Sequence, residues 1–155
     1  MKIYLATDHA GFELKEKVKE RLKGQGYIVE DEGAFVLEEG DDYPDFVSIA
    51  SKQVSSNPEE DKAIIFGGSG QGEAMVANRY KNVRAAVFYG GNEEIIIRSR
   101  EHNGANVLSI GANYVSEQEA FEAIDLWLNT PFAIDPRHLR RIAKIDGKVR
   151  DEYEF

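Results

Sequence analysis

A continuous apolar run that ends directly in a glycine-rich segment is the feature that most constrains the fold of this chain. The run Ala63-Ile64-Ile65-Phe66 contains no polar residue, which is typical of a strand covered on both faces of a parallel sheet. The next residues, Gly67-Gly68-Ser69-Gly70-Gln71-Gly72-Glu73, open a predicted helix. Because a strand, a loop and a helix in this order form part of a parallel crossover, the pattern favours an α/β fold.

The same alternation of strand-like and helix-like segments runs along the rest of the chain. Strands are predicted at residues 3–6, 27–29, 63–66, 83–88 and 106–110, and helices at 11–23, 44–54, 92–101 and 116–128. The triplet Ile95-Ile96-Ile97 also fits a strand. Right-handed crossovers then predict one domain over residues 1–155, a three-layer, doubly wound (Rossmann-like) sandwich with a five-stranded parallel sheet. Residues 137–155 are predicted to be a charged helical tail, disordered from residue 152 onward.

Composition narrows the class of protein. The chain of 155 residues has no cysteine, which excludes disulfides and thiolate chemistry and is compatible with the cytoplasm. Its net charge of −9 argues against nucleic-acid binding. No apolar run approaches the roughly 20 residues that a membrane helix needs. One basic cluster, Arg137-His138-Leu139-Arg140-Arg141, instead suggests a small anionic ligand or an acidic partner surface.

Ligands of doubly wound sheets bind beyond the carboxyl ends of the strands, where the glycine-rich segment is predicted to lie. Its backbone N–H groups can converge on an anion, although an ordinary strand–helix turn explains the same composition equally well. The segment lacks the Gly-Lys-Ser/Thr of a P-loop and the third glycine of a dinucleotide fingerprint. Glu73 suits the first turn of any helix. Beside an anion cradle, however, its carboxylate fits a general base better than a phosphate ligand.

The chain holds three histidines, His9, His102 and His138, each near a predicted strand end or in the basic cluster. A single histidine is more often structural, but the three together favour proton transfer. Their spacing and the lack of cysteine predict no metal site. Arg137 and Arg141 share one helix face and suit phosphate, although a solvated basic helix end is the simpler explanation.

Several segments, in their order along the chain, resemble the family of type B ribose-5-phosphate isomerases and galactose-6-phosphate isomerase subunits. The resemblance extends from about Lys2 to Ile145. The matching segments are residues 6–15, 42–45, 67–73, 77–79, 84–86, 100–103, 105–108, 137–138 and 140–142.

This resemblance implies an aldose–ketose isomerase that interconverts ribose 5-phosphate and ribulose 5-phosphate through a cis-enediolate, with no metal or organic cofactor. It also implies a homodimer or homotetramer with shared active sites. Two alternatives stay open. The substrate is another sugar phosphate, such as galactose 6-phosphate or allose 6-phosphate, or the chain is a non-catalytic sugar-phosphate-binding module.

The resemblance also assigns roles to individual residues. Glu73 is the expected base, His102 assists ring opening, and Ser69 helps to stabilise the enediolate. The expected substrate-binding residues are Asp8, His9, Tyr43, Gly68, Gly70, Gln71, Gly72, Asn103, Arg137 and Arg141.

Two positions depart from the usual family pattern. Many members carry a cysteine base at the position of Gly67, so this chain resembles the subgroup that uses a glutamate at the position of Glu73. Asn113 stands where members usually carry a phosphate-binding arginine. The loss of one such contact costs about 1.5–3 kcal/mol unless it is compensated, which predicts weaker phosphate binding or a different sugar.

Overall fold

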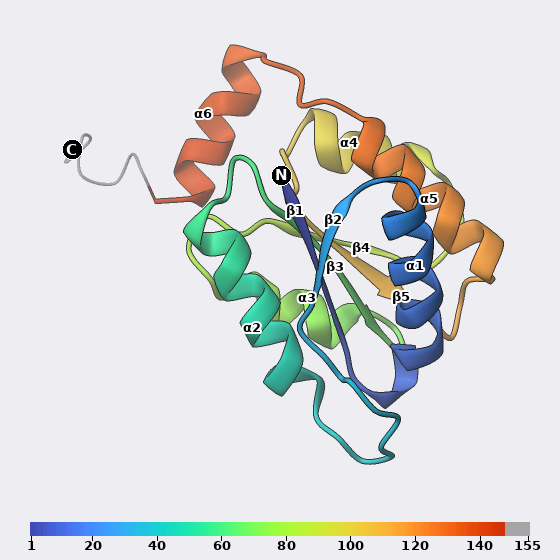
Figure 1. Ribbon diagram of the computed structural model, residues 1–155. Coiled ribbons are helices and arrows are strands. Elements are labelled where there is room, and N and C mark those ends of the chain that lie inside the picture. Colours follow the sequence, from blue (N-terminus) through green and yellow to red (C-terminus); the bar gives the residue numbers. More distant parts are fainter. Residues whose placement is uncertain (148–155) are drawn as a thin grey trace.

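In the computed structural model, which describes residues 1–147, five parallel strands form one sheet in the order β2-β1-β3-β5-β4 (Figure 1). Ile64 pairs with Leu5 on one side and with Leu108 on the other, so the central strand is bonded along both edges. All five predicted strands are confirmed. They are β1 (Lys2–Thr7), β2 (Ile28–Asp31), β3 (Lys62–Gly67), β4 (Ala85–Phe88) and β5 (Val107–Gly111).

Helices connect these strands, as the sequence predicts. Ile95–Ile97 belongs to a helix in which Ile96 is buried and Ile95 is exposed, so the strand alternative for this triplet is wrong. Ser116 and Glu119 form a capping box. The helices are α1 (Phe12–Gly24), α2 (Tyr43–Ser56), α3 (Gln71–Ala77), α4 (Glu94–Glu101), α5 (Glu117–Asn129) and α6 (Pro136–Ile145), and a short 3₁₀ helix spans His9–Gly11.

Two apolar cores lie on the two faces of the sheet. Phe66 packs on the face covered by α1, α4 and α5, and Ile65 packs on the face covered by α2 and α3. Both side chains are fully buried because neighbouring residues of a strand point to opposite faces. The three-layer sandwich is therefore confirmed, and its switch point lies between β1 and β3, whose crossovers leave in opposite directions.

The last helix closes the end of the sheet at which the strands begin. Helix α6 lies across this amino end, and Arg84, just before β4, forms an ion pair of 2.8 Å with Asp146 at the end of the helix. The predicted helical tail is thus present up to Ile145, whereas the disorder predicted from residue 152 falls outside the described residues. Among residues 1–147, no helix has the length and apolar character needed to cross a membrane.

Candidate active site

The glycine-rich segment is held rigidly at the carboxyl end of β3. Gly70 has a left-handed backbone (φ 76°), which glycine adopts without strain, and its carbonyl accepts a hydrogen bond of 2.6 Å from the Ser109 hydroxyl of β5. The segment also passes so close to β5 that a Cβ atom at Gly111 would lie 2.7 Å from the Ser69 carbonyl oxygen. This close approach fixes the path of the segment against the neighbouring strand.

Asn113, two residues after the end of β5, lies against this segment. Its backbone N–H donates to the Gly68 carbonyl at 3.1 Å, and its side-chain Nδ2 would lie 3.1 Å from a Cβ atom at Gly68. The Ser69 side chain is exposed, and its hydroxyl accepts a hydrogen bond of 3.3 Å from the Gln71 backbone N–H. Asn113 therefore places a neutral amide beside the loop.

Glu73 is the buried acid of this end of the sheet. It lies in the first turn of α3, is 4% exposed, and folds its carboxylate back against Gly67. A Cβ atom at Gly67 would overlap this carboxylate. The end of β3 therefore accommodates the Glu73 side chain only because residue 67 has none.

The pKa of Glu73 is raised above the usual value of a glutamate. Burial is the main cause, and the negative charge of Asp8 adds to it, whereas a hydrogen bond from the backbone N–H of Glu73 itself acts in the opposite direction. A carboxylate that is desolvated and lies near a second acid binds a proton more readily than one in water. This is the property that a general base working near neutral pH requires.

Two further side chains border the same space. Asp8 is 6% exposed and caps the short helix that follows β1 by accepting a hydrogen bond of 2.9 Å from the backbone N–H of Ala10. Tyr43, at the start of α2, places its hydroxyl against Gly72, where a Cβ atom would overlap it. The start of α2 thus lies beside the carboxyl ends of β1 and β3.

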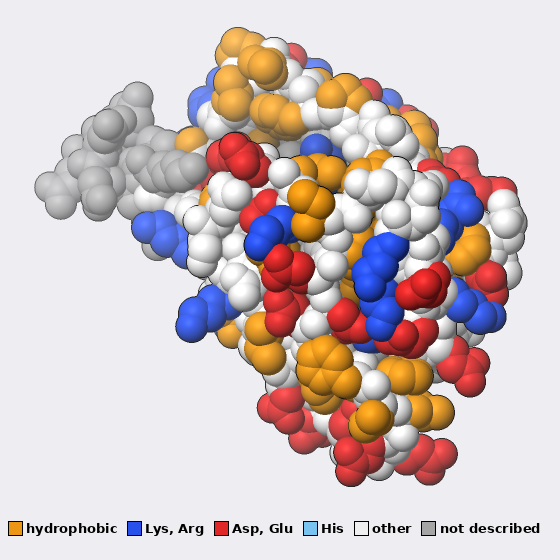
Figure 2. Space-filling view, in the orientation of Figure 1, with side chains coloured by type: hydrophobic (Ala, Val, Ile, Leu, Met, Phe, Trp, Pro, Cys, Tyr) orange, Lys and Arg blue, Asp and Glu red, His pale blue; other side chains and the backbone are white. Residues whose placement is uncertain are grey.

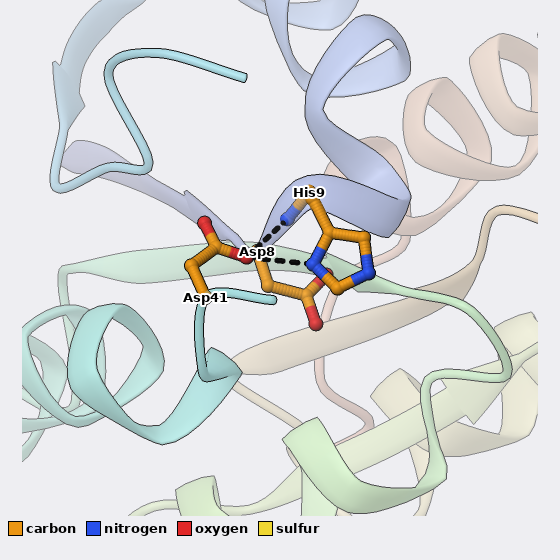
Figure 3. A group of neighbouring side chains, drawn as sticks. All are labelled: Asp8, His9 and Asp41. Carbon is orange, nitrogen blue, oxygen red and sulfur yellow. Dashed lines mark hydrogen bonds and ion pairs between the residues drawn. The ribbon is translucent and has the colours of Figure 1, made fainter. Parts of the chain in front are cut away.

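His9 is oriented by an acid that sequence reasoning did not identify. The Oδ1 atom of Asp41 lies 2.7 Å from Nδ1 of His9 and accepts a hydrogen bond of 2.8 Å from the His9 backbone N–H (Figure 3). Asp41 comes from the loop between β2 and α2, which is 32 residues away in sequence, and no local pattern predicts the contact. This loop contributes exposed acids to the lower end of the molecule (Figure 2), among them Glu38, Glu39 and Asp42.

The hydrogen bond to Asp41 raises the pKa of His9, and the charge of Asp8 raises it further. Asp8, His9 and Asp41 place three ligand atoms within 4.8 Å of one another, so their spacing is compatible with a metal ion. A raised pKa favours the protonated imidazole, which donates hydrogen bonds to oxygen atoms. The group is therefore better suited to hydrogen bonds with an oxygen-rich ligand.

The remaining predicted residues form a second group at the amino end of the sheet. His102 follows α4, and its ring stacks on that of His138 in α6, with centroids 4.4 Å apart and planes 20° apart. Arg98, which also pairs with Glu94, lies 3.0 Å from Nε2 of His102. Asn103, Arg137 and Arg141 are exposed beside this stack.

His138, one of the three histidines predicted together to favour proton transfer, is the buried partner in this stack. It is 4% exposed. Burial lowers its pKa, and the nearby His102 and Arg137 lower it further. A neutral His138 is a suitable support for His102, because two stacked imidazolium rings would repel each other. The sequence did not predict that His138 supports His102, because the two residues lie 36 positions apart in the chain.

The structure thus divides the predicted residues between opposite ends of the sheet. The carboxyl end brings together Asp8, His9, Tyr43, Gly68, Ser69, Gly70, Gln71, Gly72 and Glu73, and the amino end brings together His102, Asn103, Arg137 and Arg141. The five residues of β5 separate the two ends by about 17 Å. One copy of the chain therefore does not bring Glu73 and His102 to one substrate.

Known proteins resemble this chain over nearly its whole described length. A profile of the Ribose/Galactose Isomerase family matches residues 3–145. The ribose-5-phosphate isomerase B of Mycolicibacterium paratuberculosis is 38% identical over 142 residues, which make up 92% of this chain and 87% of that protein.

Two solved structures are similar in fold as well as in sequence. The ribose-5-phosphate isomerase B of Mycoplasma genitalium, which contains bound ribulose-5-phosphate, has a TM-score of 0.90 and 35% identity, and the match covers 97% of both chains. A ribose 5-phosphate isomerase from Thermotoga maritima has a TM-score of 0.86 and 42% identity over 94% of this chain and 97% of that one. Because sequence and fold agree over the same residues, this chain belongs to the Ribose/Galactose Isomerase family of sugar-phosphate isomerases.

Proposed function

We propose that this chain interconverts ribose 5-phosphate and ribulose 5-phosphate, with Glu73 as the base. The observation that carries this proposal is the buried Glu73 carboxylate at the end of β3, whose pKa is raised and which lies beside the glycine-rich segment. The choice of sugar is supported by the Mycoplasma genitalium relative, which was solved with bound ribulose-5-phosphate. The lack of cysteine suits a reaction in the reducing cytoplasm.

The reaction moves one proton between neighbouring carbon atoms. Glu73 removes the proton from C2 of the open-chain aldose, the C–H electron pair forms the C1–C2 double bond, and the carbonyl oxygen O1 becomes an oxyanion. The protonated Glu73 then returns its proton to C1, while the hydroxyl proton at O2 is transferred to O1. The product is the ketose, and Glu73 is again a carboxylate.

Donors around the loop stabilise the charge that develops on the enediolate. Fixed donors of this kind are often the largest electrostatic contribution to such reactions. The Ser69 hydroxyl and the backbone N–H groups of the loop hold the oxyanion, and the side chains of Asp8, His9 and Tyr43 hold the sugar oxygens. The loop residues are Gly68, Gly70, Gln71 and Gly72.

A second copy of the chain completes the site. The chemistry needs an acid or base for ring opening and cations for the phosphate, and within residues 1–147 the residues suited to both tasks lie at the other end of the sheet from Glu73. In a homodimer, His102 of one copy opens the ring, Asn103 holds a hydroxyl, and Arg137 and Arg141 bind the phosphate next to Glu73 of the other copy. Bidentate guanidinium groups suit this last role.

The exposed edge strand β4 is the surface that we assign to this contact. Three of its four residues are partly exposed, and Met75 of α3 and Ile95 of α4 are exposed beside it, by 65% and 57%. Grooves on its two sides are bordered by Gln71 and Asn103. A twofold axis perpendicular to this edge places the β4 strands of the two copies antiparallel. The carboxyl end of one sheet then lies next to the amino end of the other.

Mixed dimers test the base assignment and the shared site together. Glu73→Gln and His102→Ala are each expected to be inactive on the cyclic sugar. After mixing and random reassembly, half of the dimers contain one copy of each variant. Each of these mixed dimers has one intact site and one site with both changes, so activity should return to about a quarter of the wild-type value. A mixture of Glu73→Gln with Gly67→Ala, which alter the same half-site, is the control and should recover none. No recovery in the first mixture would show that each site lies within one copy.

Asn113 favours a second candidate substrate. Its neutral amide lies over Gly68, where the family resemblance implies a phosphate-binding arginine. A six-carbon substrate such as galactose 6-phosphate or allose 6-phosphate extends further and places its phosphate elsewhere. Values of kcat/KM for the three sugars would distinguish these substrates, and binding of all three without turnover would favour a non-catalytic binding module.

A further inference from the structure

A cavity of about 370 Å³ lies between α6 and the amino ends of the strands. It is separate from Arg137 and Arg141, the residues proposed to bind the phosphate of the substrate. Leu139, Ile142 and Ala143 of α6 line it, whereas Arg137 and Arg141 lie about half a turn away, on the exposed side of the helix. The other lining residues are Pro58, Glu59, Lys62, Arg84, Arg100, Gly104, Asn106, Phe132 and Asp146.

Positive charge is in excess among the side chains that line this cavity. Three of them are cationic (Lys62, Arg84 and Arg100) and two are carboxylates (Glu59 and Asp146). This contrasts with the net charge of −9 of the whole chain. Arg84 is paired with Asp146, and Arg100 donates a hydrogen bond of 3.1 Å to the carbonyl oxygen of Thr130. The two arginines are thus held in place by the protein itself.

Lys62 differs from both arginines. It is 8% exposed, and its ammonium makes no hydrogen bond or ion pair with any residue of the described part of the chain, residues 1–147. Burial lowers its pKa, as does the positive charge of Arg100, while Asp61 and Glu59 act in the opposite direction. The Lys62 ammonium thus lies at the cavity surface with its donors unpaired within residues 1–147, and an anion in the cavity would supply an opposite charge for it.

We propose that this cavity binds a small organic anion, whose carboxylate or phosphate group lies between Lys62 and Arg100. The apolar part of the ligand packs against Phe132, Ile142 and Ala143, which also line the cavity. The site has no residue in common with the proposed catalytic machinery, so it is a second ligand site of the chain.

The chain contains a built-in reporter of this binding. Trp127 is its single tryptophan and is fully buried, and the guanidinium of Arg100 lies 5.4 Å from the centre of its ring. An anion bound beside this guanidinium changes the electrostatic environment of the ring without moving the arginine. The fluorescence of Trp127 should therefore change when the cavity fills.

The experiment titrates the full chain with butyl phosphate, inorganic phosphate and 1-butanol, following heat by calorimetry and Trp127 fluorescence in parallel. Butyl phosphate should bind most tightly, because it alone offers both an anion and an apolar group. Lys62→Met, which keeps the aliphatic stem, should weaken its binding at least tenfold and leave ribose 5-phosphate turnover unchanged. Lys52→Met, which removes an exposed lysine of α2, is the matched control and should bind as the wild type does.

A second variant tests the apolar wall without touching a charge. Ala143→Leu fills the cavity and should weaken butyl phosphate more than inorganic phosphate. The proposal is overturned if no probe binds, if Lys62→Met binds butyl phosphate as the wild type does, or if binding is lost in Arg141→Gln instead, since this last result would place the probe in the substrate site. Binding is measured without turnover, so the result is independent of the proposed reaction.

Discussion

The carboxyl and amino ends of the sheet differ in how their functional groups are held. At the carboxyl end, Glu73 and Asp8 are buried and fixed by the backbone around them. At the amino end, Arg137 and Arg141 extend from the exposed face of α6, where Arg137 forms an exposed ion pair with Asp135, and His102 stacks on the buried His138. The carboxyl end therefore has the rigidity of a chemical centre, whereas the arginines of the amino end are free to adjust to a phosphate in the proposed dimer.

The largest expected effect is on catalysis by Glu73 at the carboxyl end of the sheet. Glu73→Gln should lower kcat for ribose 5-phosphate by about 10³-fold, within the usual range for loss of a general base, with little change in KM. The measurement is a steady-state assay of ketose formation. Turnover at the wild-type rate would refute the assignment of the base.

A thermal melt separates this effect from unfolding. Because burial raises the pKa of Glu73 in the folded state, the folded chain binds more protons than the unfolded chain between the unfolded and the folded pKa. Stability is therefore lost as pH rises through this interval. Glu73→Gln removes the loss, so its melting temperature at neutral pH should equal or exceed that of the wild type.

The second largest expected effect concerns substrate binding by the exposed arginines at the amino end of the sheet. Arg141→Gln should raise KM by about 10- to 100-fold and change kcat little, because one charge-assisted contact to the phosphate is lost. Arg140→Gln, on the same helix but on another face, is the control and should be close to the wild type. A fall in kcat with KM unchanged would mean that Arg141 does not act by binding the phosphate.

A third variant adds to the carboxyl end the cation that it lacks. Asn113→Arg should lower KM for ribose 5-phosphate by about tenfold, since the new guanidinium lies beside the loop at Gly68. The comparison is made with Asn113→Gln, which lengthens the side chain without adding charge. If the arginine raised KM instead, a different sugar would become the better candidate.

The smallest effect concerns His9. Asp41→Asn removes the acid that mainly raises the His9 pKa, so this pKa should fall toward that of an ordinary histidine. Any stability that the pair provides is present at low pH and is lost as pH rises through the folded pKa of His9. The imidazole signals in an NMR pH titration of both proteins measure this shift. An unchanged His9 pKa would contradict the role given to Asp41.

The sequence predicted the parts of the molecule that local patterns determine. The apolar run of β3, the capping box of α5 and the glycine loop are all where their residues indicate. Contacts between distant segments left no such signal. The Asp41–His9 hydrogen bond depends on the path of a long loop, and the His102–His138 stack depends on where α6 docks. The secondary structure of the Ile95–Ile97 triplet was ambiguous, because the periodicity of apolar residues does not by itself distinguish a short strand from a helix.

The close contact between Glu73 and Gly67 has a consequence for how this family evolves. The end of β3 holds the Glu73 side chain in the volume that a Cβ atom on residue 67 would occupy. A side chain at residue 67 therefore requires the Glu73 carboxylate to move away from the end of β3. We expect the two positions to covary among relatives, so that a homologue with a cysteine at 67 carries no glutamate at 73. An exchange of the base between these positions would thus be a coupled, two-step event in the lineage.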